Sequence, residues 1–136
     1  MAAGFALHPQ LAADTVPVAD FALSTVLLMD EPAWPWLVLV PRRESLREII
    51  DLAAPERALL IEEIARASTV LQSLFAPDKL NVGALGNMVP QLHVHVIARN
   101  IGDPAWPSPV WGAKARERYQ PADLQDLVRR LRGAFA

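Results

Sequence analysis

Cysteine is absent from the 136-residue sequence. This absence excludes disulfide bonds, zinc sites with thiolate ligands and cysteine nucleophiles. A chain without cysteine is compatible with the reducing environment of the cytosol. We therefore expect a cytoplasmic protein whose chemistry depends on other side chains.

Blocks of like charge and long apolar segments are missing as well. The 13 basic and 15 acidic residues leave a net charge of −2, and no Lys/Arg block is present that would follow a phosphate backbone. No apolar run approaches the roughly 20 residues that span a bilayer. The N-terminus lacks the basic and apolar regions of a signal peptide. We expect neither a nucleic-acid partner nor a membrane.

The composition is that of a chain with a well-filled core, because 52% of the residues are hydrophobic and 21% are charged. Its length is typical of one domain. We therefore predict a single domain over residues 1–136, with a core over about residues 15–100 and a C-terminal loop and helix over residues 101–136. The 12 prolines lie mostly between periodic stretches, where they do least harm.

Strand patterns occur in pairs. Residues 21–29 and 36–40 are apolar, partly β-branched and separated by the turn-like segment DEPAWP, which predicts adjacent antiparallel strands. Residues 79–84 and 92–98 predict two further strands. Together with the helices below, they favour an α+β fold with an antiparallel sheet of about five strands, one long helix and one or two short ones.

Helix signals lie between and after these strands. Ser45 and Glu48 have the spacing of a capping box and predict a short helix over residues 46–52. Pro55 suits the first turn of a longer helix that ends near residue 75. This helix carries an apolar stripe at 3–4 spacing, formed by Leu60, Ile64, Ala67, Leu71 and Leu74. A third, amphipathic helix is predicted over residues 123–135.

The densest polar cluster in an apolar context is the segment QLHVHV, residues 91–96. Because side chains alternate between the faces of a strand, Gln91, His93 and His95 are predicted to share one face. Imidazole can act near neutral pH as a nucleophile, a proton carrier or a hydrogen-bond donor. The cluster is therefore the candidate site.

The residues by themselves leave three interpretations open. Two histidines on the solvent face of a strand need no function. A metal site would use His93 and His95, with further ligands from residues such as His8, Asp78 or Asp103. A nucleophile site would use His93 to attack phosphorus, while Gln91 and His95 orient it and bind phosphoryl oxygens.

The segment NVGALGNMVPQLHVHVIAR, residues 81–99, resembles the signature of the histidine triad (HIT) family of nucleotide hydrolases and transferases. WLVLVPR, residues 36–42, resembles the family's strand that ends in an apolar-Pro-basic step, and the resemblance covers about residues 20–100. It implies an antiparallel sheet with a long helix, a homodimer, and substrates such as nucleoside phosphoramidates or dinucleoside polyphosphates. It implies a reaction that needs no metal or other cofactor.

The resemblance also implies roles for individual residues. His93 matches the nucleophile that forms a nucleotidyl-histidine intermediate, and His95 matches the histidine that contacts the α-phosphate. Asn81 matches an asparagine near the ribose and phosphate. Asn87 lies where the family commonly has glutamine, and Met88 lies where many members carry a hydroxyl that can bond the leaving group. We expect these residues to form a nucleotide site.

Three positions depart from the family pattern. Gln91 replaces the first triad histidine, and an amide cannot take a proton near pH 7. Trp36 stands where the family often has a further histidine, and Met88 brings no hydroxyl. We therefore predict a nucleotidyl hydrolase or transferase acting through His93. The alternatives are a nucleotide-binding module with weak or no activity and, less favoured, a metal site at His93 and His95.

The remaining candidates carry less information. Arg42, Arg43 and Arg99 are minor candidates for a phosphate contact, because a guanidinium can bind phosphate through two hydrogen bonds. Residues 103–111 contain three prolines and two tryptophans, which exclude a regular helix or a central strand. Whether this loop closes over a pocket or packs in a dimer is left open, as is the role of His8. Apolar sheet edges independently favour a homodimer.

Overall fold

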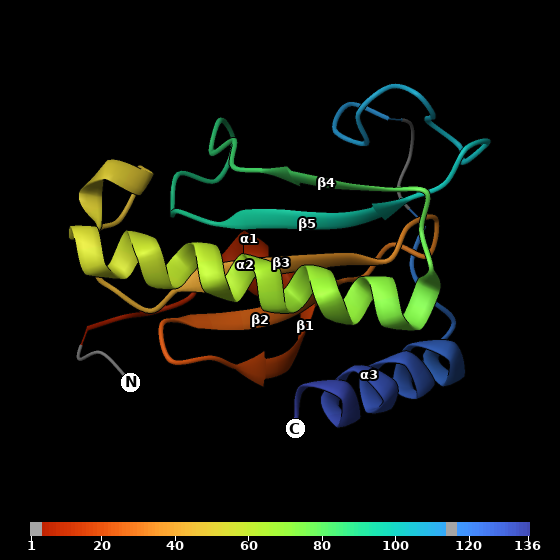
Figure 1. The fold of residues 1–136 in the computed structure, drawn as a ribbon, viewed down its shortest axis with the longest axis horizontal. Helices are drawn as coiled ribbons and strands as arrows, with labels where there is room; N and C mark the ends of the chain where they lie inside the picture. Colours follow the sequence, from red (N-terminus) through yellow and green to blue (C-terminus); the bar gives the residue numbers. More distant parts are fainter. Residues whose placement is uncertain (1–3, 114–116) are drawn as a thin grey trace.

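The computed structural model describes residues 4–113 and 117–136. Its elements are, in chain order, α1 (Pro9–Asp14), β1 (Thr15–Asp20), β2 (Ser24–Met29), β3 (Trp36–Pro41), the 3-10 helix η1 (Ile49–Asp51), α2 (Ala54–Phe75), β4 (Lys79–Gly83), β5 (Val94–Arg99) and α3 (Pro121–Phe135) (Figure 1). In the described part of the chain, every helix is too short or too polar to cross a membrane.

The five strands form one antiparallel sheet in the order β1-β2-β3-β5-β4. The predicted α+β fold with a five-stranded antiparallel sheet is confirmed. The two strands predicted on either side of DEPAWP are neighbours, with Val26 opposite Leu39. The strand of the histidine segment, β5, lies between β3 and β4, so it is held on both sides.

Strand β1 and helix α1 carry no clear pattern in the sequence. The six residues TVPVAD include Pro17, which lacks an amide hydrogen and normally argues against a strand. Here β1 is an edge strand, and the pairing with β2 shifts register between Pro17 and Ala19. An edge tolerates proline because one side of the strand needs no hydrogen-bond partner.

The short helix predicted over residues 46–52 is wrong. Ser45 has a φ of 59°, in the left-handed region, whereas an N-cap residue needs an extended backbone. The helical geometry is limited to the single turn of η1, which begins after Glu48. Its capping box pairs Glu48 with Asp51, whose carboxylate accepts hydrogen bonds from the amides of Arg47 and Glu48 over 3.1 and 2.9 Å. These backbone hydrogen bonds lower the pKa of Asp51.

Two apolar layers cover the two faces of the sheet. Helices α2 and α3 lie on one face (Figure 1) and bury alternate strand residues such as Val96 and Ala98. From α2, Leu60, Ala67 and Leu71 are buried, as the predicted stripe requires. The opposite face packs against α1, the N-terminal segment and residues around Val110.

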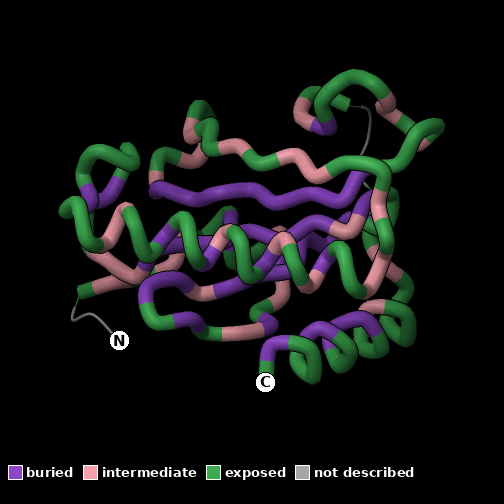
Figure 2. Tube along the Cα trace, viewed as in Figure 1, coloured by how far each residue is buried: buried purple, intermediate pink, exposed green. Residues whose placement is uncertain are grey.

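Burial is greatest in the central strands, and β3 and β5 are buried along their whole length (Figure 2). Alternation along β5 places Val94 and Val96 on the helix-covered side and His95 on the other. The candidate site therefore lies on the face of the sheet opposite α2.

Candidate active site

The two histidines lie side by side where β5 begins. His95 is the second residue of β5 and pairs with Val38 on one side and Gly83 on the other. His93 comes immediately before the strand. Their ring centroids are 4.8 Å apart with the planes at 74°, and both residues are only 6% exposed. The predicted juxtaposition of these imidazoles is present in the structure.

One ring nitrogen of His93 is held by the backbone. Nδ1 lies 2.7 Å from the carbonyl oxygen of Gln91. A carbonyl oxygen can only accept, so Nδ1 carries the proton in this bond. In the neutral imidazole the lone pair then belongs to Nε2. Nε2 of His93 is thus the nitrogen that can act as a nucleophile.

His95 is enclosed by aromatic rings. Its centroid lies 5.6 Å from that of Trp36 and 5.3 Å from that of Trp111, both in edge-on arrangements. The indole Nε1–H of Trp36 donates to Nδ1 of His95 over 3.0 Å. Burial, together with the proximity of His93, lowers the pKa of His95 to about 3. His95 is therefore neutral at pH 7.

Both imidazoles line a pocket with a volume of about 600 Å³. The other walls come from Glu31 and Trp34 after β2, Trp36 at the start of β3, and the segments 85–89 and 110–113. Three indoles, a buried carboxylate and two imidazoles therefore meet in one cavity. Such a cavity suits a ligand with a flat ring and polar substituents.

Trp111 approaches the sheet closely because Gly83 has no side chain. A Cβ atom built on Gly83 would lie 3.0 Å from Cη2 of Trp111, which is tighter than ordinary contacts. The glycine thus leaves room for the indole beside His95. Glu31 carries no sequence signal for a function, and the sequence left open whether the loop that carries Trp111 closes over a pocket or packs in a dimer. Both residues line the pocket because of how distant loops pack beside β5, which no local pattern predicts.

Gln91 is placed differently from the prediction. Strand β5 begins at Val94, so alternation does not extend to Gln91. The side-chain oxygen of Gln91 accepts from the amide of His8 over 2.8 Å, and its Nε2 donates to the carbonyl of Ala6 over 2.8 Å. The side chain of Gln91 therefore binds the N-terminal segment, and only its backbone carbonyl contacts His93.

Two other candidates within the signature, Asn87 and Met88, both line the pocket. They belong to the loop between β4 and β5, in which Gly86 has a φ of 78°. Met88 is 92% exposed, so its side chain lies at the rim rather than inside. This loop, which precedes the two histidines in the chain, forms one wall of the pocket.

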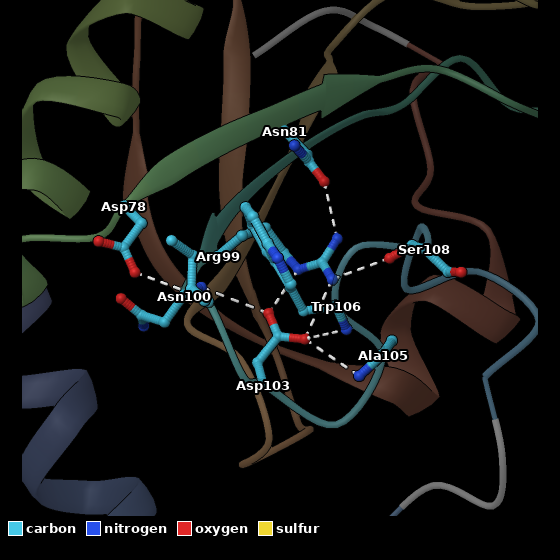
Figure 3. A network of polar contacts seen from close by, with 9 residues as sticks. Asp78, Asn81, Arg99, Asn100, Asp103, Ala105, Trp106 and Ser108 are labelled. Carbon is cyan, nitrogen blue, oxygen red and sulfur yellow. Dashed lines mark hydrogen bonds and ion pairs between the residues drawn. The ribbon is translucent and has the colours of Figure 1, made fainter.

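Asn81 and Arg99 belong to a separate polar network (Figure 3). The Oδ1 atom of Asn81 accepts from Nη1 of Arg99 over 2.9 Å. Arg99 is 1% exposed and forms an ion pair with Asp103 at 2.7 Å, and its Nη2 also donates to the carbonyl of Ser108. The idea that Arg99 contacts a phosphate is wrong, because its guanidinium is buried and committed to these partners.

Asp103 organises the loop that follows β5. Besides its ion pair with Arg99, its carboxylate accepts from the amides of Ala105 and Trp106 over 3.0 and 2.8 Å (Figure 3). The hydrogen bonds from Arg99 are the main reason why the pKa of Asp103 is well below its usual range. The network anchors the segment that leads to Trp111, so it supports a wall of the pocket from outside.

The residues considered as additional metal ligands have other partners. Nδ1 of His8 accepts from the amide of Gln10 over 3.0 Å at the start of α1, and Asp78 accepts from the amide of Ile101 over 2.8 Å. Within residues 4–113 and 117–136, no three side chains of His, Cys, Asp or Glu are grouped so that they could hold a metal ion.

The HIT domain family matches residues 10–101 of the chain. A histidine triad protein of Bradyrhizobium japonicum is 45% identical over 97% of this chain and 98% of its own, with a TM-score of 0.93. One from Sinorhizobium meliloti 1021 is 38% identical over 96% and 97%, with a TM-score of 0.93. One from Marinobacter aquaeolei VT8 is 45% identical over 96% and 95%, with a TM-score of 0.92.

Comparison with curated proteins yields no significant match. The domain match and the structural similarity over nearly the whole chain are sufficient to assign the family. This chain belongs to the HIT family. The predicted membership is confirmed.

Proposed function

We propose that the protein is a nucleotide-binding hydrolase or transferase that acts through a nucleotidyl-His93 intermediate. The observation that carries this proposal is the hydrogen bond between Nδ1 of His93 and the Gln91 carbonyl. It leaves the lone pair on Nε2 of a histidine that lines an aromatic pocket. A neutral, oriented imidazole is the form that can attack phosphorus.

The chemistry of the pocket fits a nucleoside monophosphate group. Indole rings of Trp34, Trp36 and Trp111 offer faces and edges against which a base can pack. The carboxylate of Glu31 can accept hydrogen bonds from ribose hydroxyls. The volume of about 600 Å³ is in the range of small-ligand pockets. A cytoplasmic location, as the sequence predicts, would supply such substrates.

The proposed reaction has two steps. Nε2 of His93 attacks the α-phosphorus, an N–P bond forms, and the bond to the leaving group breaks with its electron pair on the leaving group. Water then attacks the same phosphorus, the N–P bond breaks, and its electron pair returns to Nε2. The water proton passes to solvent or to the released phosphate. In a transferase, another nucleophile takes the place of water.

The second candidate function is a nucleotide-binding module without turnover. The placement of Gln91 favours it, because that side chain is engaged by Ala6 and His8 and cannot also serve the reacting groups. Exposed Met88 brings no hydroxyl to the leaving group. Such a module would bind AMP or GMP saturably and give no mass increase on His93.

Hydrolysis of adenosine and guanosine phosphoramidates and of a diadenosine polyphosphate tests the proposal at neutral pH without added metal. Wild type is expected to turn over at least one of them, with His93→Ala inactive. His8→Asn is the matched control, because His8 caps α1 and does not line the pocket. Turnover that survives His93→Ala would refute the mechanism; saturable binding with no adduct would favour the binding module.

We also propose a homodimer, as the family resemblance implies. Within the described sheet, β4 is an edge strand. Apolar side chains on and after it are exposed, with Val82 at 50%, Leu85 at 46% and Met88 at 92%. A second copy of the chain would cover this edge. Light scattering at micromolar concentration should give twice the mass of the chain; the monomer mass would contradict the proposal.

A further inference from the structure

The hydrogen bond between Trp36 and His95 has a direction that the chemistry determines. An indole Nε1–H can donate but cannot accept. It lies 3.0 Å from Nδ1 of His95, and both residues are buried, at 8% and 6% exposure. Nδ1 of His95 must therefore accept, and the single proton of the neutral ring belongs to Nε2.

His93 has the opposite arrangement. Its Nδ1 faces a carbonyl oxygen, which can only accept, and therefore carries the proton. Two imidazoles whose centroids are 4.8 Å apart thus hold opposite tautomers. His93 offers a lone pair at Nε2, whereas His95 offers an N–H at Nε2.

We infer that Trp36 is a positioning residue that holds His95 as the Nε2–H tautomer, so that a neutral N–H donor stands beside the nucleophile. The substitution of tryptophan for a family histidine then has a specific consequence. A histidine at this position could donate or accept and would leave the tautomer of His95 undetermined. Tryptophan can only donate this hydrogen bond, so Nδ1 of His95 can only accept it.

Neighbouring rings keep the imidazole of His95 from rotating away from the indole N–H of Trp36. Its ring is in edge-on contact with Trp36, His93 and Trp111. Trp111 in turn lies against Gly83, which is paired with His95 in the sheet. The low pKa of His95, about 3, keeps the ring neutral at physiological pH and so preserves the one-donor state.

The chemical consequence rests on the proposed function. If His93 attacks phosphorus, a fixed N–H at His95 can donate to a phosphoryl oxygen as negative charge develops there. A donor that is oriented before the reaction needs no reorganisation during it. Trp36 therefore acts on the reaction through His95, without contact to the reacting atoms.

Long-range ¹H–¹⁵N NMR of the imidazole rings tests the inference without any substrate. The chain has only three histidines, so His8→Asn and His93→Ala spectra suffice to assign the signals. In wild type, His95 should show a protonated-type Nε2 and an unprotonated-type Nδ1, and His93 the reverse. Wild-type His95 with a protonated-type Nδ1 would overturn the inference.

Trp36→Phe removes the donor and keeps an aromatic ring. The Nδ1 signal of His95 is expected to move toward the averaged position of a mixed tautomer. Trp34→Phe is the matched control. Trp34 is another buried indole in the same pocket, with its ring centroid 6.3 Å from that of Trp36, and it forms no hydrogen bond with His95. It should leave the His95 pattern as in wild type. An unchanged pattern in Trp36→Phe would refute the role of Trp36.

Kinetics separate this inference from the proposed function. With a substrate that wild type turns over, Trp36→Phe should lower kcat on the order of 10-fold, because one preorganised donor loses its fixed orientation. If NMR shows opposite tautomers for His93 and His95 but the protein turns over no substrate, the positioning role of Trp36 is supported and the proposed hydrolase or transferase activity is refuted. If turnover depends on His93 but NMR shows a protonated-type Nδ1 on His95, the proposed activity is supported and the positioning role of Trp36 is refuted.

Discussion

Gln91 is joined to His93 through its backbone and to the N-terminal segment through its side chain. Its backbone carbonyl oxygen lies 2.7 Å from Nδ1 of His93. Its side-chain amide forms hydrogen bonds of 2.8 Å with the backbone of both Ala6 and His8. Gln91 thus holds the ring of His93 with a backbone atom that every amino acid has. Its side chain serves a structural purpose.

This relationship predicts the effect of Gln91→Ala. The change removes two hydrogen bonds to the N-terminal segment and should lower the free energy of unfolding by about 1–2 kcal/mol. It should leave the carbonyl bond to His93, and with it most of kcat, in place. Urea unfolding and steady-state kinetics measure both. Gln10→Ala, which removes an exposed bond to Asp14, is the control and should cost about 0.5 kcal/mol or less. A loss of activity without a loss of stability would contradict the prediction.

The low pKa of His95 predicts how stability depends on pH. The unfolded chain takes up a proton near the ordinary histidine pKa of 6.5, whereas the folded chain does so only near 3. The unfolded state therefore binds more protons in this window, and stability falls as the pH falls, by up to about 1.4 kcal/mol per pH unit.

Urea unfolding between pH 6.5 and about 4.5 isolates this effect, because the carboxylates with lowered pKa titrate mainly below this window. His95→Gln cannot be protonated and should show a shallower slope than wild type. The absolute stability of the variant does not enter this comparison. Equal slopes in the two proteins would show that His95 is protonated in the folded state.

The ion pair of Arg99 and Asp103 predicts a large loss of stability on Asp103→Ala. The two side chains are 1% and 7% exposed, so the change leaves a buried guanidinium without its main partner. We expect a cost of about 3–5 kcal/mol. Asp126→Ala breaks an exposed pair with Arg129, with 53% and 75% exposure, and should cost less than about 1 kcal/mol. Similar costs at the two sites would contradict the structural role of the network.

Gly83 predicts a connection between the sheet and the pocket wall. Gly83→Val would place side-chain atoms where Cη2 of Trp111 lies, since even a Cβ would be 3.0 Å from it. The indole must then move away from His95. We expect weaker binding of AMP, on the order of 10-fold, and altered tryptophan fluorescence. Titration calorimetry measures the first effect.

Gly133 provides the matched control for this prediction. It lies in α3, and a Cβ built there meets no atom within 4 Å. Gly133→Ala should leave AMP binding unchanged and stabilise the protein by about 0.5–1 kcal/mol, because alanine favours the helix. Unchanged binding in Gly83→Val would show that Trp111 does not form part of the nucleotide site.

Local patterns in the sequence determined the fold class and the centre of the site. Alternation in the segment 91–96 placed His93 and His95 side by side, because two-residue periodicity is a property of the backbone itself. Pro55 and the apolar stripe likewise predicted α2 closely. The helix predicted after Ser45 was wrong because the backbone there is left-handed, and the edge strand that contains Pro17 carried no pattern that predicts it.

Only the tertiary structure decided what surrounds the histidines. The partner of His95 is Trp36, 59 residues away in the chain, and the partners of the Gln91 side chain are 83 and 85 residues away. Such contacts depend on how strands and loops pack, and no local period encodes them. The sequence determined that two imidazoles lie two residues apart where a strand begins; the packing of a distant tryptophan against His95 decided which nitrogen of that ring faces a donor.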